Sequence, residues 1–171
     1  MSGKKITESA VELFTRANGD VKGIEGYIKV EDFDENNRAY GAYHAQQMTE
    51  KLFKGYLIHK NKKPEWGHNL IEYYNDALKI DKNFKNLENE IHHLNIYNAG
   101  IKYSTKLDVD EKKFMKILED IKKVYNFSAF QNIYDEFLND KLCKKIKTER
   151  FDKMIEDYNY IIDNSRLDEN I

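Results

Sequence analysis

The sequence contains few of the residues that interrupt helices. It has one proline and eight glycines among 171 residues, while 34% of the residues are Asp, Glu, Lys or Arg. Proline and glycine are the least favourable residues inside a helix, whereas Leu, Lys and Glu are among the more favourable ones. This scarcity of helix breakers excludes a turn-rich sheet protein and predicts an all-α fold.

Cysteine, long apolar runs and a strong net charge are also missing. Cys143 is the single cysteine, which excludes an internal disulfide framework and suits a reducing cytoplasm. No apolar run approaches the length of a membrane-spanning helix, and the N-terminal residues 1–10 lack the apolar core of a signal peptide. The net charge of −2 gives no global attraction to nucleic acid or anionic membranes. We therefore expect a soluble cytoplasmic protein with no membrane partner.

Apolar residues recur at three- and four-residue intervals along most of the chain, which indicates amphipathic helices. Asn18-Gly19-Asp20 is expected to end one helix and cap the next. Asp110 is expected to cap the helix that begins after it. The predicted architecture is an up-and-down bundle of about five helices over residues 1–127, with a two-helix C-terminal extension over residues 128–171 packed on or near it. The expected helices cover about residues 8–17, 21–28, 38–60, 68–80, 84–103, 111–125, 128–146 and 148–162.

The longest predicted helix, residues 38–60, has two adjoining faces of different character. At 100° per residue, one narrow apolar stripe contains Ala45, Met48, Leu52 and Tyr56. The adjoining polar flank contains His44, Gln47, Lys51 and Lys54. One interpretation is a solvated surface in which Glu50 and Lys54 form an ion pair across one helical turn. The other is a ligand site, because lysine and histidine can bind a phosphate oxygen while an amide reads a base edge.

Two further features each allow a structural and a functional interpretation. His68 begins a helix after the turn at Pro64 and Gly67, where it either caps the helix or brings a ligand phosphate near the helix N-terminus. A basic cluster near the C-terminus either is a solvated face neutralised by nearby Asp and Glu or binds single-stranded nucleic acid with the aromatic residues around it. The cluster consists of Lys141, Lys144, Lys145, Lys147 and Arg150.

Metal binding has little support in the sequence. Glu90 and His93 have the spacing that places a carboxylate and an imidazole on one helical face, as in diiron bundles. Such a centre needs further inward glutamates at mirrored positions, and no convincing set is present. Phosphate-binding glycine loops, nucleophile elbows and zinc spacings are also missing. We therefore expect neither a metal nor another cofactor.

Residues 43–77, "YHAQQMTEKLFKGYLIHKNKKPEWGHNLIEYYNDA", resemble the core signature of the HEPN family of helical domains. The resemblance covers roughly residues 8–127 and implies a bundle of about five helices that dimerises through its long helices. It places a Gln, Glu, Lys and Lys series on one helix, then a proline-containing turn, then Gly-His-x-Leu at the start of the next helix. The matching residues are Gln46 or Gln47, Glu50, Lys51, Lys54, Pro64, Gly67, His68 and Leu70.

The resemblance implies several activities. Some family members are metal-independent ribonucleases, including toxins paired with nucleotidyltransferase antitoxins, while others bind nucleotides or position substrate beside a nucleotidyltransferase. The ribonucleases carry an arginine and, after four to six residues, a histidine near the end of a late helix. Here Lys102-Tyr103 stands where many members have Arg-Tyr, and no histidine follows. Arg38 and His44 satisfy the spacing, but on an earlier helix.

We therefore predict a dimeric HEPN-like protein that binds a nucleotide or RNA-related ligand without catalysis of its own. It would act beside a nucleotidyltransferase or in a defence or toxin–antitoxin system. The first alternative is an endoribonuclease in which Arg38 and His44 act across a dimer cleft. The second is an interaction module that docks a partner through residues 128–171. The ligand-binding residues are predicted to be His44, Gln47, Lys51, Lys54, His68, Lys102 and Tyr103.

Overall fold

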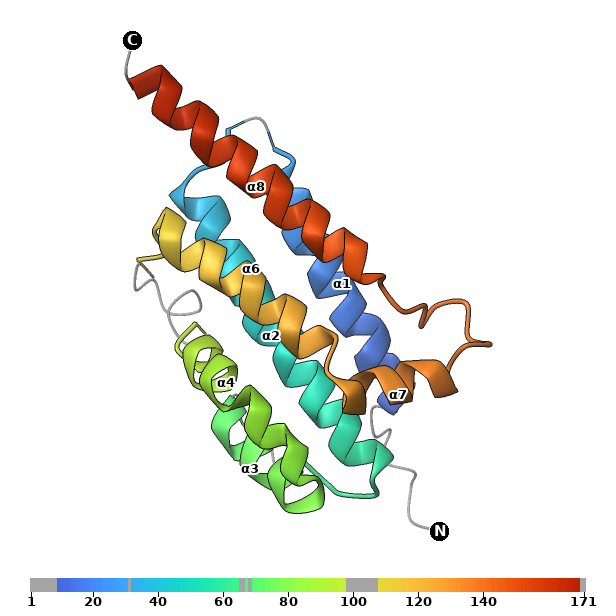
Figure 1. The fold of residues 1–171 in the computed structure, drawn as a ribbon. Coiled ribbons are helices and arrows are strands. Elements are labelled where there is room, and N and C mark those ends of the chain that lie inside the picture. The colour runs from blue at the N-terminus through green and yellow to red at the C-terminus, as the bar shows by residue number, and fades with distance from the viewer. Residues whose placement is uncertain (1–8, 31, 65–66, 68, 98–107, 170–171) are drawn as a thin grey trace.

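The computed structural model describes residues 9–30, 32–64, 67, 69–97 and 108–169, with side chains described as far as residue 165. These residues form helices and no strand, so the predicted all-α fold is confirmed (Figure 1). None of the described helices combines the length and the apolar character needed to cross a membrane. The helices are α1 (Ala10–Ile28), α2 (Glu35–His59), α3 (Leu70–Ile80), the 3-10 helix η1 (Lys82–Leu87), α4 (Glu88–Asn95), α6 (Glu111–Tyr125), α7 (Ser128–Glu136) and α8 (Thr148–Glu169).

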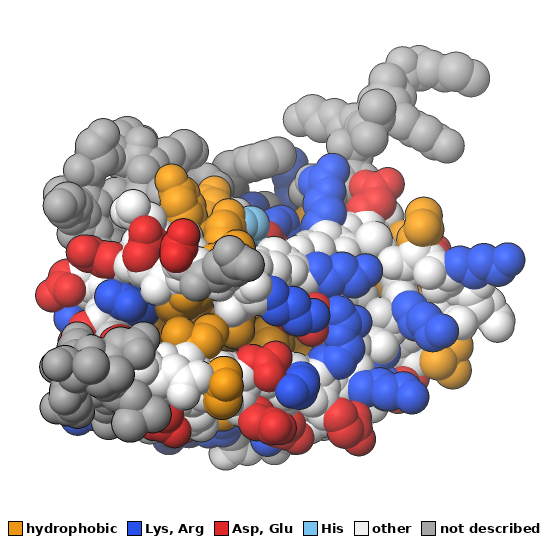
Figure 2. Space-filling model, turned by 90° about the horizontal axis from the view of Figure 1, so that it is seen from above, with side chains coloured by type: hydrophobic (Ala, Val, Ile, Leu, Met, Phe, Trp, Pro, Cys, Tyr) orange, Lys and Arg blue, Asp and Glu red, His pale blue; other side chains and the backbone are white. Residues whose placement is uncertain are grey.

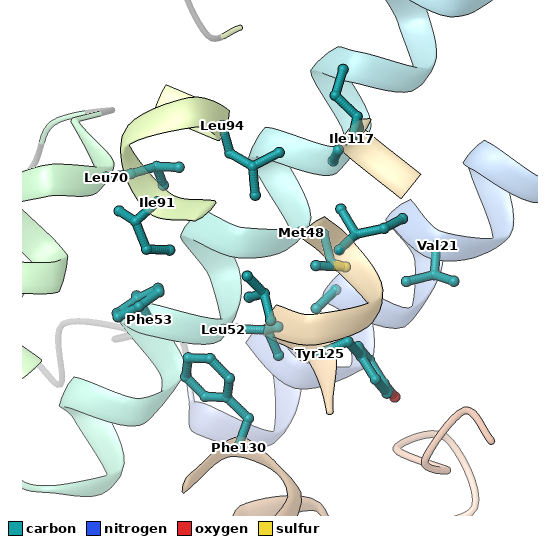
Figure 3. Close-up of a cluster of buried hydrophobic side chains, with 14 of the residues drawn as sticks. Val21, Met48, Leu52, Phe53, Leu70, Ile91, Leu94, Ile117, Tyr125 and Phe130 are labelled. Carbon is teal, nitrogen blue, oxygen red and sulfur yellow. The ribbon is translucent and has the colours of Figure 1, made fainter. Parts of the chain in front are cut away.

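Helix α2 is the centre of the bundle. It contacts α1, α3, α4, α6 and α7, and α8 packs on α6 and α1 (Figure 1). Apolar side chains from these helices meet in one core around α2 (Figure 3). The apolar stripe predicted for α2 is confirmed, because its members are at most 3% exposed. The labelled core residues are Val21, Met48, Leu52, Phe53, Leu70, Ile91, Leu94, Ile117, Tyr125 and Phe130.

Polar side chains fix the starts of several helices. Ser9 and Glu12 form a reciprocal capping box at the start of α1. The side chains of Asn69 and Asp110 accept backbone N–H groups in the first turns of α3 and α6. The predicted cap at Asp110 is confirmed. Such caps satisfy backbone donors that have no partner within the helix.

The predicted break at Asn18-Gly19-Asp20 is wrong, since α1 continues through all three residues. Asn18 and Asp20 are 3% and 6% exposed, and both side chains bond to other elements instead of capping a helix end. The Asn18 amide oxygen accepts the hydroxyl protons of Tyr125 and Tyr134, and its nitrogen donates to the Lys144 carbonyl. Tertiary hydrogen bonds therefore replace the local ones that would have ended the helix.

Two predicted helices are shorter or divided in the structure. The segment predicted as 84–103 begins within η1 and continues as α4 to Asn95; its residues 98–103 lie outside the described residues. The segment predicted as 128–146 ends as α7 at Glu136. Beyond α7, the Asp140 carboxylate accepts the backbone N–H groups of Leu142 and Cys143, and the Ile146 N–H donates to the Tyr125 hydroxyl. These bonds hold a compact turn in place of a helix.

Buried tyrosines should make the stability of the fold decrease at high pH. Burial raises the pKa of Tyr125 to about 12, and burial also raises the pKa values of Tyr134 and Tyr158. Because the unfolded pKa is about 10, this stabilisation is complete below pH 10 and decreases as the pH rises from 10 towards 12. We expect a cooperative loss of helical circular dichroism in that window, together with a rise in tyrosinate absorbance. Noncooperative titration of all tyrosines near pH 10, with the helices intact, would contradict this.

Candidate functional site

The polar flank of α2, defined as His44, Gln47, Lys51 and Lys54, lies in a half-buried position. The side chains of His44, Lys51 and Lys54 are 28%, 23% and 16% exposed. The flank bonds to a carboxylate of α1 through His44 and Lys51, and Lys54 reaches the ring of Tyr73 on α3. Contacts with α1 and α3 therefore cover part of the flank, and bulk water reaches the rest.

Asp20 of α1 binds two members of the flank. One carboxylate oxygen lies 2.9 Å from His44 Nδ1, and the other lies 2.6 Å from Lys51 Nζ. The imidazole also lies over Gly23, where an added Cβ would be 3.5 Å from three ring atoms, and near the ring of Tyr27. These contacts fix the orientation of His44. Because Asp20 bonds to Nδ1, a ligand would bind the imidazole through Nε2.

Glu50 binds the other two members of the flank, Gln47 and Lys54. Its carboxylate is buried and accepts Lys54 Nζ at 2.7 Å and Gln47 Nε2 at 3.3 Å. Gln47 Nε2 also donates to the Gln46 side-chain oxygen at 2.7 Å. Burial by itself would lower the pKa of Lys54, but the hydrogen bond and negative charge of Glu50 outweigh it, so the pKa of Lys54 lies above its ordinary value. Lys54 is therefore charged at neutral pH.

Tyr73 connects Lys54 of the flank to the turn before α3. Lys54 Nζ lies 5.5 Å from the centre of the Tyr73 ring, and the Tyr73 hydroxyl donates to the Gly67 carbonyl. The structure thus brings together Glu50, Lys54 and Gly67, three positions of the family-like signature. Three predicted ligand-binding residues, His68, Lys102 and Tyr103, lie outside the described residues.

Asp20 and Tyr73 were missed in the sequence-based prediction of the site. Asp20 was interpreted as a helix cap, and Tyr73 was not distinguished from the other tyrosines. The available signal was the spacing of Asp20, Gly23 and Tyr27, which places all three on one face of a continuous α1. That face lies against His44 and Lys51.

Arg38 and His44 have different neighbours within one chain. Arg38 Nε donates to the Val109 carbonyl at 2.7 Å, just before α6, whereas His44 contacts Asp20 on α1. The structure therefore does not pair the two side chains within one subunit. The endoribonuclease alternative would have to use them across two copies.

Glu90 and His93 connect α4 to α6. Glu90 bonds to Lys123 Nζ at 2.5 Å, and His93 Nδ1 lies 2.5 Å from the buried carboxylate of Asp120. Lys116 also reaches Asp120, at 2.7 Å. Among the described residues, no group of three or more His, Cys, Asp or Glu side chains is arranged to hold a metal ion. The pairs act as ionic contacts between two helices.

The basic cluster near the C-terminus is interleaved with acids. Lys145 lies 3.1 Å from Asp135, and Arg150 forms a bidentate contact with Glu25 of α1. In Figure 2, Lys and Arg side chains gather on the right half of the view, with Asp and Glu among them. The Arg150 contact attaches the start of α8 to α1, so part of the cluster holds the C-terminal helix in place.

Comparison with known proteins identifies a family that matches most of the chain. The model of the HEPN domain family matches residues 10–133, from the start of α1 into α7. Searches of curated proteins and of solved structures found no match. The family match includes the whole polar flank of α2 and its partners Asp20, Glu50 and Tyr73. It ends before α8.

Proposed function

This chain belongs to the HEPN domain family, and on that basis we propose that it binds a nucleotide or RNA-related ligand along the polar flank of α2, without catalysis of its own. Four polar side chains of the flank lie within eleven residues of one helix: the two lysines, His44 and Gln47. The ammonium groups suit phosphate oxygens, and the amide can read the edge of a base.

The observation that supports this proposal is the pair of carboxylates that neutralise the lysines. Asp20 and Glu50 are both buried, and each contacts one lysine of the flank. Half-buried ion pairs contribute little net stability compared with apolar residues of similar size, because both charges lose hydration. The half-buried position of Lys51 and Lys54 on the central helix therefore supports ligand binding, since departures from the apolar pattern concentrate at functional sites.

The proposal also includes a homodimer and a nucleotidyltransferase partner, in a defence or toxin–antitoxin setting. Both follow from the properties of the family. In this arrangement a second copy would cover the exposed part of the polar flank, and the ligand would lie between the two copies. Because Asp20 and Glu50 cancel the lysine charges in the free protein, a ligand phosphate would have to share or displace a carboxylate.

We expect ATP or a short single-stranded RNA to raise the melting temperature of the protein. A ligand at 100 times its dissociation constant adds about 2.7 kcal/mol to the free energy of unfolding. The stabilisation should be lost in Lys51→Met, which keeps the aliphatic stem but removes the ammonium group, and in Gln47→Ala. Differential scanning fluorimetry measures both effects.

Lys79→Ala is the matched control, because Lys79 is on α3 with 80% of its side chain exposed. It should retain the ligand-induced shift. No shift with any nucleotide or RNA would refute the proposed function, and an unchanged shift in both flank variants would place the ligand elsewhere. Cleavage of the RNA during incubation would favour the endoribonuclease alternative over simple binding.

A further inference from the structure

A surface pocket of about 470 Å³ lies where the C-terminal end of α6 meets the starts of α7 and α8. Its volume is within the range of about 300–1,000 Å³ that is typical of small-molecule sites. None of its lining residues belongs to α2. The pocket therefore lies apart from the polar flank, and the inference drawn from it does not depend on the flank being a ligand site.

The wall of the pocket is apolar and rigid. Its accessible apolar side chain is Phe127, which is partly exposed, with the buried side chain of Leu87 behind it. The Phe127 ring lies 4.9 Å from the ring of Phe84 and 6.0 Å from that of Phe130, measured between centroids. Because both neighbours are core residues, Phe127 is held in one orientation. A flat ring can pack against such a surface without ordering a mobile side chain first.

The rim carries two lysines, and one of them can change partners at low cost. Lys122 Nζ lies 2.5 Å from Asp152, whose side chain is 53% exposed. A bound anion can therefore replace Asp152, which would return to water. Lys123 is different, because its partner Glu90 is 9% exposed and would be left as a buried charge. Glu119 on the rim offsets one of the two positive charges.

Polar groups near Lys122 extend the anion-binding capacity of the rim. Ser128 begins α7 on the edge of the pocket, and no described side chain caps that helix. Thr148 begins α8 on the same edge, with its hydroxyl donating to the Asn126 side chain at 2.8 Å. Backbone N–H groups at helix starts add to the attraction of a nearby ammonium group for an anion.

We propose that this pocket binds a small molecule that carries a flat aromatic ring and a phosphate. The ring packs on Phe127, and the phosphate binds Lys122 and the hydroxyl of Ser128. The wall of the pocket is apolar and its rim carries lysines. A ligand with only a ring or only a phosphate would therefore contact one of these two parts. The ligand would contact α6 and the starts of α7 and α8, and would hold the C-terminal helix against the bundle.

AMP is the probe, titrated into the full chain by isothermal titration calorimetry, with adenosine and inorganic phosphate as its separate parts. We expect AMP to bind more tightly than either part. Lys122→Ala should weaken AMP binding about tenfold or more, as loss of a charge-assisted hydrogen bond does. Ser128→Tyr should abolish binding, because the new ring would fill the pocket from an exposed position.

Lys112→Ala, on an exposed position of α6, and Lys51→Met, on the polar flank, should leave AMP affinity unchanged. Absence of AMP binding would overturn the inference, as would affinity that survives both Lys122→Ala and Ser128→Tyr. Equal affinity for AMP and phosphate would overturn the two-part ligand. Binding lost only in Lys51→Met would support the proposed function and contradict this pocket as the site.

Discussion

Replacing Asn18 with leucine should lower the free energy of unfolding by about 3 kcal/mol, because it removes the acceptor of the Tyr125 hydroxyl and the donor to the Lys144 carbonyl. The Tyr134 hydroxyl keeps the Phe14 carbonyl as a partner. The Asn18 oxygen lies 2.7 Å from the hydroxyl of Tyr125 and 2.8 Å from that of Tyr134, and its nitrogen lies 2.8 Å from the carbonyl of Lys144. These bonds join α1 to α6, α7 and the segment before α8. Leucine has a similar volume, so lost hydrogen bonding dominates the effect.

Chemical denaturation monitored by circular dichroism measures this change. Asn132→Leu is the control, because Asn132 is exposed on α7 and should alter stability by less than about 0.5 kcal/mol. Tyr134→Phe should have a smaller effect than Asn18→Leu, since it removes one hydroxyl and leaves Asn18 with two other partners. Equal stability of Asn18→Leu and the control would show that the network contributes nothing.

The same network matters for the candidate site. The side-chain bonds of Asn18 attach α1 to α6 and α7 two residues before Asp20, and a continuous α1 places Asp20, Gly23 and Tyr27 against His44. A variant that loosens this region should therefore weaken ligand binding on the flank as well as stability.

Two glycines on neighbouring helices should respond oppositely to the same substitution. An added Cβ at Gly55 of α2 would lie 2.6 Å from two carbons of the Phe14 ring, whereas at Gly19 of α1 nothing lies within 4 Å. Gly55→Ala should therefore destabilise the protein by about 1–3 kcal/mol, the typical cost of overpacking a core. Gly19→Ala should stabilise it by about 0.4–1 kcal/mol, because alanine favours the helix and restricts the unfolded chain.

Thermal and chemical unfolding of the two variants, side by side, measure this difference in sign. Gly19→Ala serves as the internal control, because both glycines are inside helices and neither has a positive φ. Helix propensity by itself would predict stabilisation in both variants. Stabilisation by Gly55→Ala would therefore mean that α1 and α2 do not pack as closely as the structure shows.

Local periodicity explains which parts of the fold could be predicted. Helix α2 was expected over residues 38–60 and occupies Glu35–His59, and the alignment of its apolar stripe and polar flank follows from 100° per residue. The Asp110 cap was also predictable, because a cap and its helix are adjacent in sequence. The end of α7 could not be predicted in this way, since the bond from Ile146 to Tyr125 joins residues far apart in sequence.

The sequence by itself determined that the chain is all-α, that it has a HEPN-like signature, and that four polar side chains share one flank of its longest helix. Each of these depends on residues within a few helical turns of one another. Only the tertiary structure decided that Asp20 of α1 binds His44 and Lys51 of that flank, and that a pocket forms where α6, α7 and α8 meet. Those features require distant segments to come together, and the energies that select such pairings, from burial and buried hydrogen bonds, are not encoded in local periodicity.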